Sequence, residues 1–125
     1  MKKLFGIRGA TQCLNEPADI ELHVCALYDE LLNKNALRES DIVSIIFSVT
    51  ADINVRNPAS ALRAVKGIPD VTLFVVQEAQ IIGGLERVIR ILLHCYLDET
   101  ARPVHIYQNG AEILRKDRSL PFNRQ

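Results

Sequence analysis

The sequence predicts an α+β fold, with a mixed β-sheet of about five strands covered by two helices. Two runs rich in β-branched residues, Ile42–Val49 and Val71–Val76, are typical of buried strands. Two other stretches, residues 17–33 and 85–97, carry apolar residues at helical spacing. Asn109-Gly110 lies between two short apolar segments, a pattern that indicates a β-hairpin. Together these patterns predict a sheet with helices packed on it.

The bulk composition predicts a single globular domain over residues 1–117, with residues 118–125 as a flexible C-terminal tail. The chain is 48% hydrophobic, which excludes a disordered protein, and its formal net charge of zero argues against a nucleic-acid or membrane-surface partner. No apolar run approaches the length of a membrane span. The three cysteines, Cys13, Cys25 and Cys95, lack metal-ligand spacing, so we expect no metal site and a reduced, cytoplasmic setting.

The first half of the chain predicts a short strand, a helix, a long strand and a short helix. The strand Lys3–Ile7 ends at Arg8-Gly9. The first helix has Asn15 as its cap and Pro17 in its first turn, and it runs to about Asn33. Its apolar stripe repeats at helical spacing through Ile20, Val24, Leu27 and Leu31. After the strand Ile42–Val49, a short helix follows Pro58 and carries Arg63.

The second half predicts a strand, a helix and a hairpin. The strand Val71–Val76 leads through a turn at Gly83-Gly84 into a helix, Leu85–Leu97. On that helix Arg90 lies well away from the apolar stripe, so it should face solvent or a partner chain. Val104–Tyr107 and Ala111–Leu114 should pair as a hairpin. Because the two long strands look buried on both faces, we expect the protein to self-associate through its sheet.

The most informative pair of charged residues is Glu78 and Arg90. Glu78 lies at the exit of a predicted strand, and Arg90 follows the glycine pair. A carboxylate and a guanidinium held on two elements across a turn suit the binding of a polar small molecule. The alternative interpretation is an ordinary connection with two incidental solvated charges.

Several segments, taken in order, resemble the monofunctional chorismate mutases of the AroH class. They are Gly6–Thr11, Pro58–Arg63, Gln77-Glu78, Gly83–Leu85, Val88–Arg90 and His105–Tyr107. The resemblance extends from Lys3 to about Asp117, and it implies a pseudo-α/β-barrel homotrimer with the sheets at the centre and active sites between adjacent subunits. It also implies the rearrangement of chorismate to prephenate, on the route to phenylalanine and tyrosine, without cofactor, metal or covalent intermediate.

The same resemblance implies roles for individual residues. Arg90 matches the cation that stabilises negative charge on the ether oxygen in the transition state, and Glu78 the carboxylate that accepts a hydrogen bond from the ring hydroxyl. Arg8 and Tyr107 match groups that bind substrate carboxylates. The backbone from Phe74 to Glu78, which includes Val75, Val76 and Gln77, matches the segment that lines the pocket floor. Arg63 matches a mouth arginine from the neighbouring chain, and Leu114 and Arg115 match residues near a C-terminal lid.

Some positions depart from the common pattern of that family. Asn57 stands where an aromatic residue is usual, Ser60 where lysine can occur, and Phe74 and Val75 replace smaller or polar residues. Lys116-Asp117 replaces the usual Pro-Asp. These departures leave two alternatives open: a non-catalytic trimer that binds an anionic metabolite, and a relative that acts on a chorismate analogue.

Overall fold

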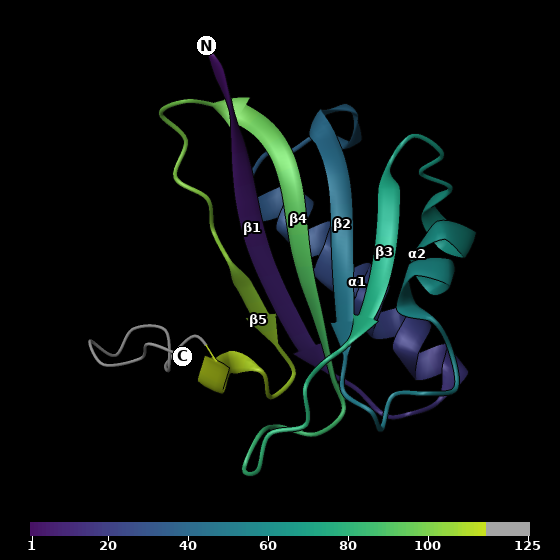
Figure 1. Cartoon of the computed structure of the whole chain (residues 1–125). Helices are drawn as coiled ribbons and strands as arrows, with labels where there is room; N and C mark the ends of the chain where they lie inside the picture. Colours follow the sequence, from purple (N-terminus) through teal and green to yellow (C-terminus); the bar gives the residue numbers. More distant parts are fainter. Residues whose placement is uncertain (115–125) are drawn as a thin grey trace.

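The computed structural model describes residues 1–114, and Arg115 and the predicted tail lie outside the described residues. The elements are β1 (Lys2–Gln12), α1 (Pro17–Lys34), the short 3-10 helix η1 (Glu39–Asp41), β2 (Ile42–Val49), α2 (Pro58–Lys66), β3 (Thr72–Gln77), β4 (Val88–Asp98) and β5 (Ile106–Gln108). The strands form one five-stranded sheet in the order β3-β2-β4-β1-β5 (Figure 1). The predicted α+β fold, with a mixed sheet and two helices, is therefore confirmed.

The sheet mixes antiparallel and parallel pairs around the long central strand β4. β4 pairs antiparallel with β1 on one side and with β2 on the other. β3 extends the sheet parallel to β2, and β5 extends it parallel to β1. In Figure 1 both helices lie on one side of the sheet, and within the described residues the opposite face carries no helix across its central strands. We call these the covered face and the open face.

The core lies between the covered face and the two helices. Alternate residues of the strands, such as Ile45, Phe47 and Leu93, are fully buried there. They pack in one cluster with the predicted apolar stripe of α1, formed by Ile20, Val24, Leu27 and Leu31. A Cβ atom at Gly9 would lie 3.1 Å from side-chain atoms of Leu27 and Leu31, so glycine in β1 allows the helix to pack closely on the strand.

The predicted helix Leu85–Leu97 is wrong, because this segment contains the strand β4. Ile89, Ile91 and Leu93 are buried, whereas Arg90 and Leu92 between them are exposed. The segment is apolar on both sides of the strand, so its residues also match a helical stripe, and periodicity alone cannot separate the two. The related prediction that Arg90 points away from its own core is confirmed, although the reason is strand alternation rather than helical position.

The predicted hairpin between Val104–Tyr107 and Ala111–Leu114 is also wrong. β5 pairs in parallel with β1, nearly a hundred residues earlier in the chain. Asn109 and Gly110 do form a turn, with φ angles of 55° and 103°, but residues 112–114 after it are helical. β5 therefore pairs with the free edge of β1, and not with the segment that follows it in the chain.

Smaller corrections concern the ends of the first elements. β1 is longer than predicted, because it continues through Gly9 to Gln12. The N-cap of α1 is Glu16, not Asn15, and its side chain makes no capping hydrogen bond. The Asn15 side chain instead accepts hydrogen bonds from the backbone N–H groups of Asn54 and Val55, at 3.0 and 3.3 Å. It therefore ties the start of α1 to the connection after β2.

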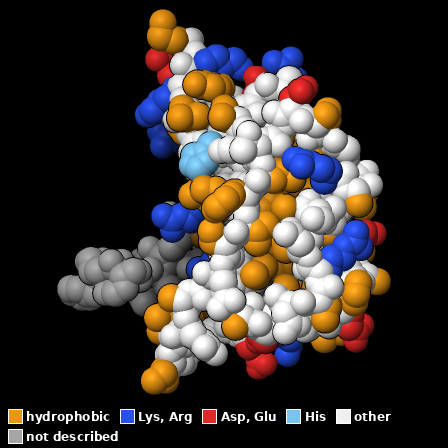
Figure 2. Space-filling view, turned by 45° about the vertical axis from the view of Figure 1, so that its right-hand side comes forward, with side chains coloured by type: hydrophobic (Ala, Val, Ile, Leu, Met, Phe, Trp, Pro, Cys, Tyr) orange, Lys and Arg blue, Asp and Glu red, His pale blue; other side chains and the backbone are white. Residues whose placement is uncertain are grey.

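Within the described residues of one chain, the strands β2 and β3 are covered on one side only, because the open face has no helix packed on it. Phe74 is 62% exposed, and Val76, Leu92 and Tyr96 are also exposed. Figure 2 shows hydrophobic side chains gathered on this side of the molecule, with arginine and lysine side chains among them. The predicted second cover is not part of the described chain, and self-association stays a prediction.

Candidate active site

The open face brings together polar side chains from neighbouring strands. In the register of the sheet, Arg90 of β4 lies between Ala10 of β1 and Ser48 of β2. Tyr107 of β5 pairs with Ala10 on its other side. Directly paired residues project from the same face, so these four positions form one row across the sheet. Ala10 contributes only a methyl group between Tyr107 and Arg90.

Glu78 follows β3 and turns its side chain toward this row. Its backbone N–H donates to the carbonyl oxygen of Val49 at 2.8 Å, which fixes the loop to the end of β2. Its Oε2 accepts from Arg90 Nε at 2.8 Å and from the hydroxyl of Ser48 at 2.9 Å. The Glu78 side chain is only 17% exposed, whereas that of Arg90 is 45% exposed. The sequence-predicted pair is therefore brought into direct contact.

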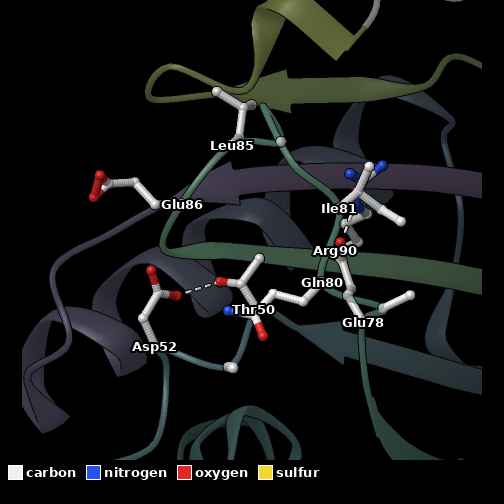
Figure 3. A pocket seen from close by; sticks show the side chains of 11 residues that line it. Thr50, Asp52, Glu78, Gln80, Ile81, Leu85, Glu86 and Arg90 are labelled. Carbon is white, nitrogen blue, oxygen red and sulfur yellow. Dashed lines mark hydrogen bonds and ion pairs between the residues drawn. The ribbon is translucent and has the colours of Figure 1, made fainter.

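Next to this pair lies a cavity of about 250 Å³. Residues of the connection after β2, parts of the loop between β3 and β4, and Arg90 line it. Figure 3 shows Glu78 and Arg90 together on one side, with Thr50 and Asp52 on another. Ile81 and Leu85 add apolar surface to the wall. Charged and polar groups next to an apolar wall suit a small polar ligand with a hydrocarbon ring.

The loop that forms the cavity wall is anchored where it returns to the sheet. Asp52 accepts two hydrogen bonds from the backbone N–H of Arg87, both at 3.0 Å, and one from the Thr50 hydroxyl. The N–H of Val88 in turn donates to Thr50 Oγ1 at 2.9 Å. Arg87 has a φ of 49°, an uncommon value for a residue with a side chain. These bonds fix the end of the loop, so the carboxylate of Asp52 has a structural role.

Arg8 and Tyr107, the two other predicted binding residues, lie at the β1–β5 edge of the open face. Arg8 is exposed, and its backbone N–H donates to His105 Nδ1 at 2.9 Å just before β5 begins. Tyr107 is nearly buried, in a small cluster with Ala10 and Ala111, and Leu114 packs against it. The predicted binding residues Arg8, Tyr107 and Leu114 are therefore all placed along this edge.

A second hollow, of about 340 Å³, lies at the opposite edge of the sheet, between β3 and α2. It is lined by Arg63, Phe74, Val75, Asn57 and Ser60, among others. Arg63 donates to the carbonyl oxygen of Val71 at 3.1 Å. Within one chain the predicted site residues therefore lie in two separate groups, one around Arg90 and one around Arg63.

Val75 and Asn57 have structural explanations in this hollow. Val75 packs against the hydrophobic core on the covered face, where an apolar side chain is suited. As a valine it also carries no side-chain hydrogen-bond donor for Glu78. Asn57 is the N-cap of α2, and its side chain accepts from the N–H groups of Ala59 and Ser60 at 2.8 and 3.1 Å. Val76 belongs to the open face, while Gln77 ends β3 just before Glu78.

The cysteines are free thiols and take no part in the cavity. Burial raises the pKa of both Cys13 and Cys95 to about 11, so at neutral pH they stay protonated and are poor nucleophiles. In the described part of the chain, no group of three or more histidine, cysteine or acidic residues is arranged to hold a metal ion. No helix among residues 1–114 could cross a membrane.

Comparison with known proteins identifies the family. A family model described as chorismate mutase type I matches residues 4–118. The chain belongs to the type I chorismate mutase family. It is 30% identical to chorismate mutase AroH of Bacillus subtilis, with 94% of each chain aligned, and 33% identical to that of Thermus thermophilus, over 90% of this chain and 93% of the relative.

A solved structure of a chorismate mutase supports the same conclusion for the fold. The chorismate mutase from Clostridium thermocellum superposes with a TM-score of 0.82 at 37% identity, covering 87% of this chain and 98% of that one. The resemblance found in the sequence is thereby confirmed. The strand β4 therefore belongs to a fold shared with a solved chorismate mutase.

Sequence reasoning missed Ser48 and the pair Thr50 and Asp52. A usable signal existed for Ser48, because Ser44 and Ser48 interrupt an otherwise apolar strand at even spacing. Buried polar side chains in a strand normally have a hydrogen-bonding partner. Asp52 gave no such signal, since acidic residues are common in exposed connections.

Proposed function

We propose that the protein catalyses the rearrangement of chorismate to prephenate, in phenylalanine and tyrosine biosynthesis. The observation that carries the proposal is the contact between Arg90 Nε and Glu78 Oε2 at 2.8 Å, at the edge of a cavity of about 250 Å³. Membership of the type I chorismate mutase family supports it. The names of the relatives, which are chorismate mutases, support it further.

The chemistry of the pair fits an intramolecular Claisen rearrangement. As the ether bond breaks, negative charge grows on the ether oxygen, and a fixed guanidinium there stabilises the transition state more than the ground state. We assign this role to Arg90. Glu78 accepts a hydrogen bond from the ring hydroxyl and offsets positive charge on the ring. Binding also holds the flexible substrate in its compact conformer. The reaction needs no cofactor, metal ion or covalent intermediate.

The charges around the cavity support a site completed by a second chain. Among the described residues, three carboxylates and a single arginine line it: Asp52, Glu78, Glu86 and Arg90. Chorismate is a dicarboxylate and needs more cations than this chain places at the cavity walls. Arg8 is on the same face, and Arg63 is in the second hollow at the far edge.

We therefore include a homotrimer in the proposal, as a pseudo-α/β-barrel. Its sheets pack open face to open face at the centre, and Arg63 of one chain reaches the cavity of the next. The backbone of Phe74, Val75, Val76 and Gln77 lines the floor of the shared pocket, and Arg8 and Tyr107 bind substrate carboxylates. We also include Leu114 and Arg115 among the substrate-binding residues, of which Arg115 lies outside the described residues. A cytoplasmic location completes the proposal.

The direct test follows chorismate consumption and prephenate formation by the purified protein. Wild-type protein should convert chorismate, and Arg90→Ala should lower kcat by roughly 10²–10³, the usual cost of removing one preorganised donor. Arg38→Ala is the matched control, because Arg38 makes a similar single contact to Asp41 at 3.3 Å and does not line the cavity. Arg38→Ala should keep full activity. Near-normal turnover by Arg90→Ala would contradict the assigned role.

The two alternatives predict different results in the same experiment. A non-catalytic binding trimer would bind dicarboxylates saturably and form no product. A relative specific for an analogue would bind chorismate competitively and convert it slowly or not at all. Unchanged chorismate after incubation with folded wild-type protein would therefore reject the mutase proposal, and binding measurements would then separate these two.

A further inference from the structure

Ser48 contacts the Glu78 side chain from the neighbouring strand β2. It is the next-to-last residue of β2, and on the open face it lies between Arg90 of β4 and Val76 of β3. Its hydroxyl donates to Glu78 Oε2 at 2.9 Å. The Glu78 backbone is tied to β2 as well, through its N–H to Val49. The carboxylate is thus held from the strand below it, independently of Arg90.

Both donors use the same oxygen atom of Glu78. Arg90 Nε and the Ser48 hydroxyl meet at Oε2. Among residues 1–114, no hydrogen bond engages Glu78 Oε1, and none engages the two terminal nitrogens of Arg90. Arginine and carboxylate groups frequently pair through two parallel hydrogen bonds, with both oxygens engaged. Here the pair is joined by one bond only, and the second donor on Oε2 comes from Ser48.

We propose that Ser48 is a positioning residue whose hydroxyl keeps the Glu78–Arg90 pair singly bonded, and so leaves one carboxylate oxygen and the terminal guanidinium nitrogens for the ligand. Without the hydroxyl, the carboxylate turns about its last side-chain bond and places Oε1 on a terminal nitrogen of Arg90. The closed pair then occupies the acceptor and the donors that the substrate requires. This inference rests on the proposed function for its effect on turnover, but its geometric part does not.

The chain offers closely matched variants for the test. The test variants are Ser48→Val and Ser48→Thr. Valine and threonine side chains have nearly the same shape and suit a strand, but only threonine keeps the hydroxyl. Ser44→Val is a control on the same strand and face. Ser44 lies opposite His94, and its hydroxyl lies 3.1 Å from His94 Nδ1, so it repeats the arrangement of Ser48 away from the cavity. Ser48→Ala serves as a second hydroxyl-free variant if valine prevents folding.

Kinetics with chorismate are the first readout. Ser48→Val should lower kcat roughly ten- to a hundredfold, the effect of a lost hydrogen bond to a charged group, and should change KM much less. Ser48→Thr should keep most of the activity, and Ser44→Val all of it. A purely structural serine would lower the melting temperature and leave kcat unchanged. Equal kcat for Ser48→Val and Ser48→Thr would overturn the proposal, as would an equal loss in Ser44→Val.

Crystal structures of the ligand-free variants are the second readout, and they do not depend on activity. In Ser48→Val both oxygens of Glu78 should contact Arg90, whereas wild type and Ser48→Thr should show a single Nε contact. A Glu78 carboxylate that stays singly bonded in Ser48→Val would overturn the inference. If wild-type protein fails to convert chorismate, the proposed function is rejected, and the structural comparison still decides the role of Ser48.

Discussion

The two faces of the sheet differ sharply although the same strands form both. On β2, Phe47 is fully buried against the helices, and its neighbour Ser48 holds a carboxylate at the cavity. On β4, Ile91 and Ile89 are buried, while Arg90 between them contacts Glu78. Because strand side chains alternate, a step of one residue moves from the core to the site.

Stability and chemistry are therefore separable in this fold. The covered face supplies most of the buried apolar surface, the main source of folding free energy. The open face carries the charged groups and exposed apolar side chains that a ligand or a second chain can use. Substitutions on the covered face should therefore lower stability, whereas those on the open face should change assembly or turnover.

The largest expected effect is loss of assembly through the open face. Phe74→Asp would place a carboxylate in an apolar interface, and an unpaired buried charge costs several kcal/mol. Sedimentation should show an assembly of 14.0 kDa chains in wild type and single chains in the variant. Leu22→Asp is the control, because Leu22 is also 62% exposed but lies on α1. Dissociation by Leu22→Asp alone would place the interface on the helices.

On the covered face, Phe47→Ala should be the most damaging single change to stability. Removing a fully buried phenylalanine typically costs about 3–5 kcal/mol of unfolding free energy. Chemical denaturation would measure it. Ile46→Ala, one residue along and half-buried on the open face, should cost much less in the unfolding of the isolated chain. Similar losses in both variants would mean that the open face is packed as tightly as the core.

On the open face, Glu78→Gln should lower activity with little effect on folding. The amide keeps the shape but removes the charge, so kcat should fall by roughly 10²-fold. The melting temperature should change little, because partly exposed ion pairs contribute less than about 1 kcal/mol. Glu30→Gln, which removes an exposed contact to Lys34 on α1, is the control for both measurements. Normal turnover by Glu78→Gln would exclude a role for its charge.

Two glycines of β1, one on each face, allow the faces to be compared by adding a single methyl group. Gly9→Ala would place a Cβ atom 3.1 Å from Leu27 and Leu31, so it should destabilise the protein by about 1–3 kcal/mol. At Gly6, on the open face, the nearest atom is a Leu92 side-chain carbon at 3.6 Å, an ordinary contact. Gly6→Ala should therefore leave unfolding of the isolated chain nearly unchanged. Thermal melts of both variants would test the difference.

The smallest effect is expected at the edge between the two faces. Asn57→Ala removes the side-chain cap of α2 and should lower unfolding free energy by about 1 kcal/mol. Asn57→Asp keeps an accepting oxygen and should retain most of that stability. An aromatic residue at this position would also lack the cap. No loss in Asn57→Ala would show that the cap contributes nothing measurable.

Local sequence patterns predict the helices and strands whose apolar residues follow one clear period. β2, the apolar stripe of α1 and the short helix after Pro58 were all predicted from local patterns, within a few residues at their ends. Glu78 and Arg90 were also singled out in advance. Local patterns suffice there because only one face of α1 is apolar, and because β-branched runs fit a strand better than a helix.

The conformation of β4, the partner of β5 and the position of Ser48 depend on tertiary contacts. β4 is apolar on both sides, so its pattern fits a helix as well as a strand, and pairing with both β1 and β2 selects the strand. β5 has a local hairpin signal, but the open edge of β1 offered a better partner. The position of Ser48 beneath Glu78 depends on the register of three strands. Such long-range contacts leave no period in the sequence, because they join residues far apart in the chain.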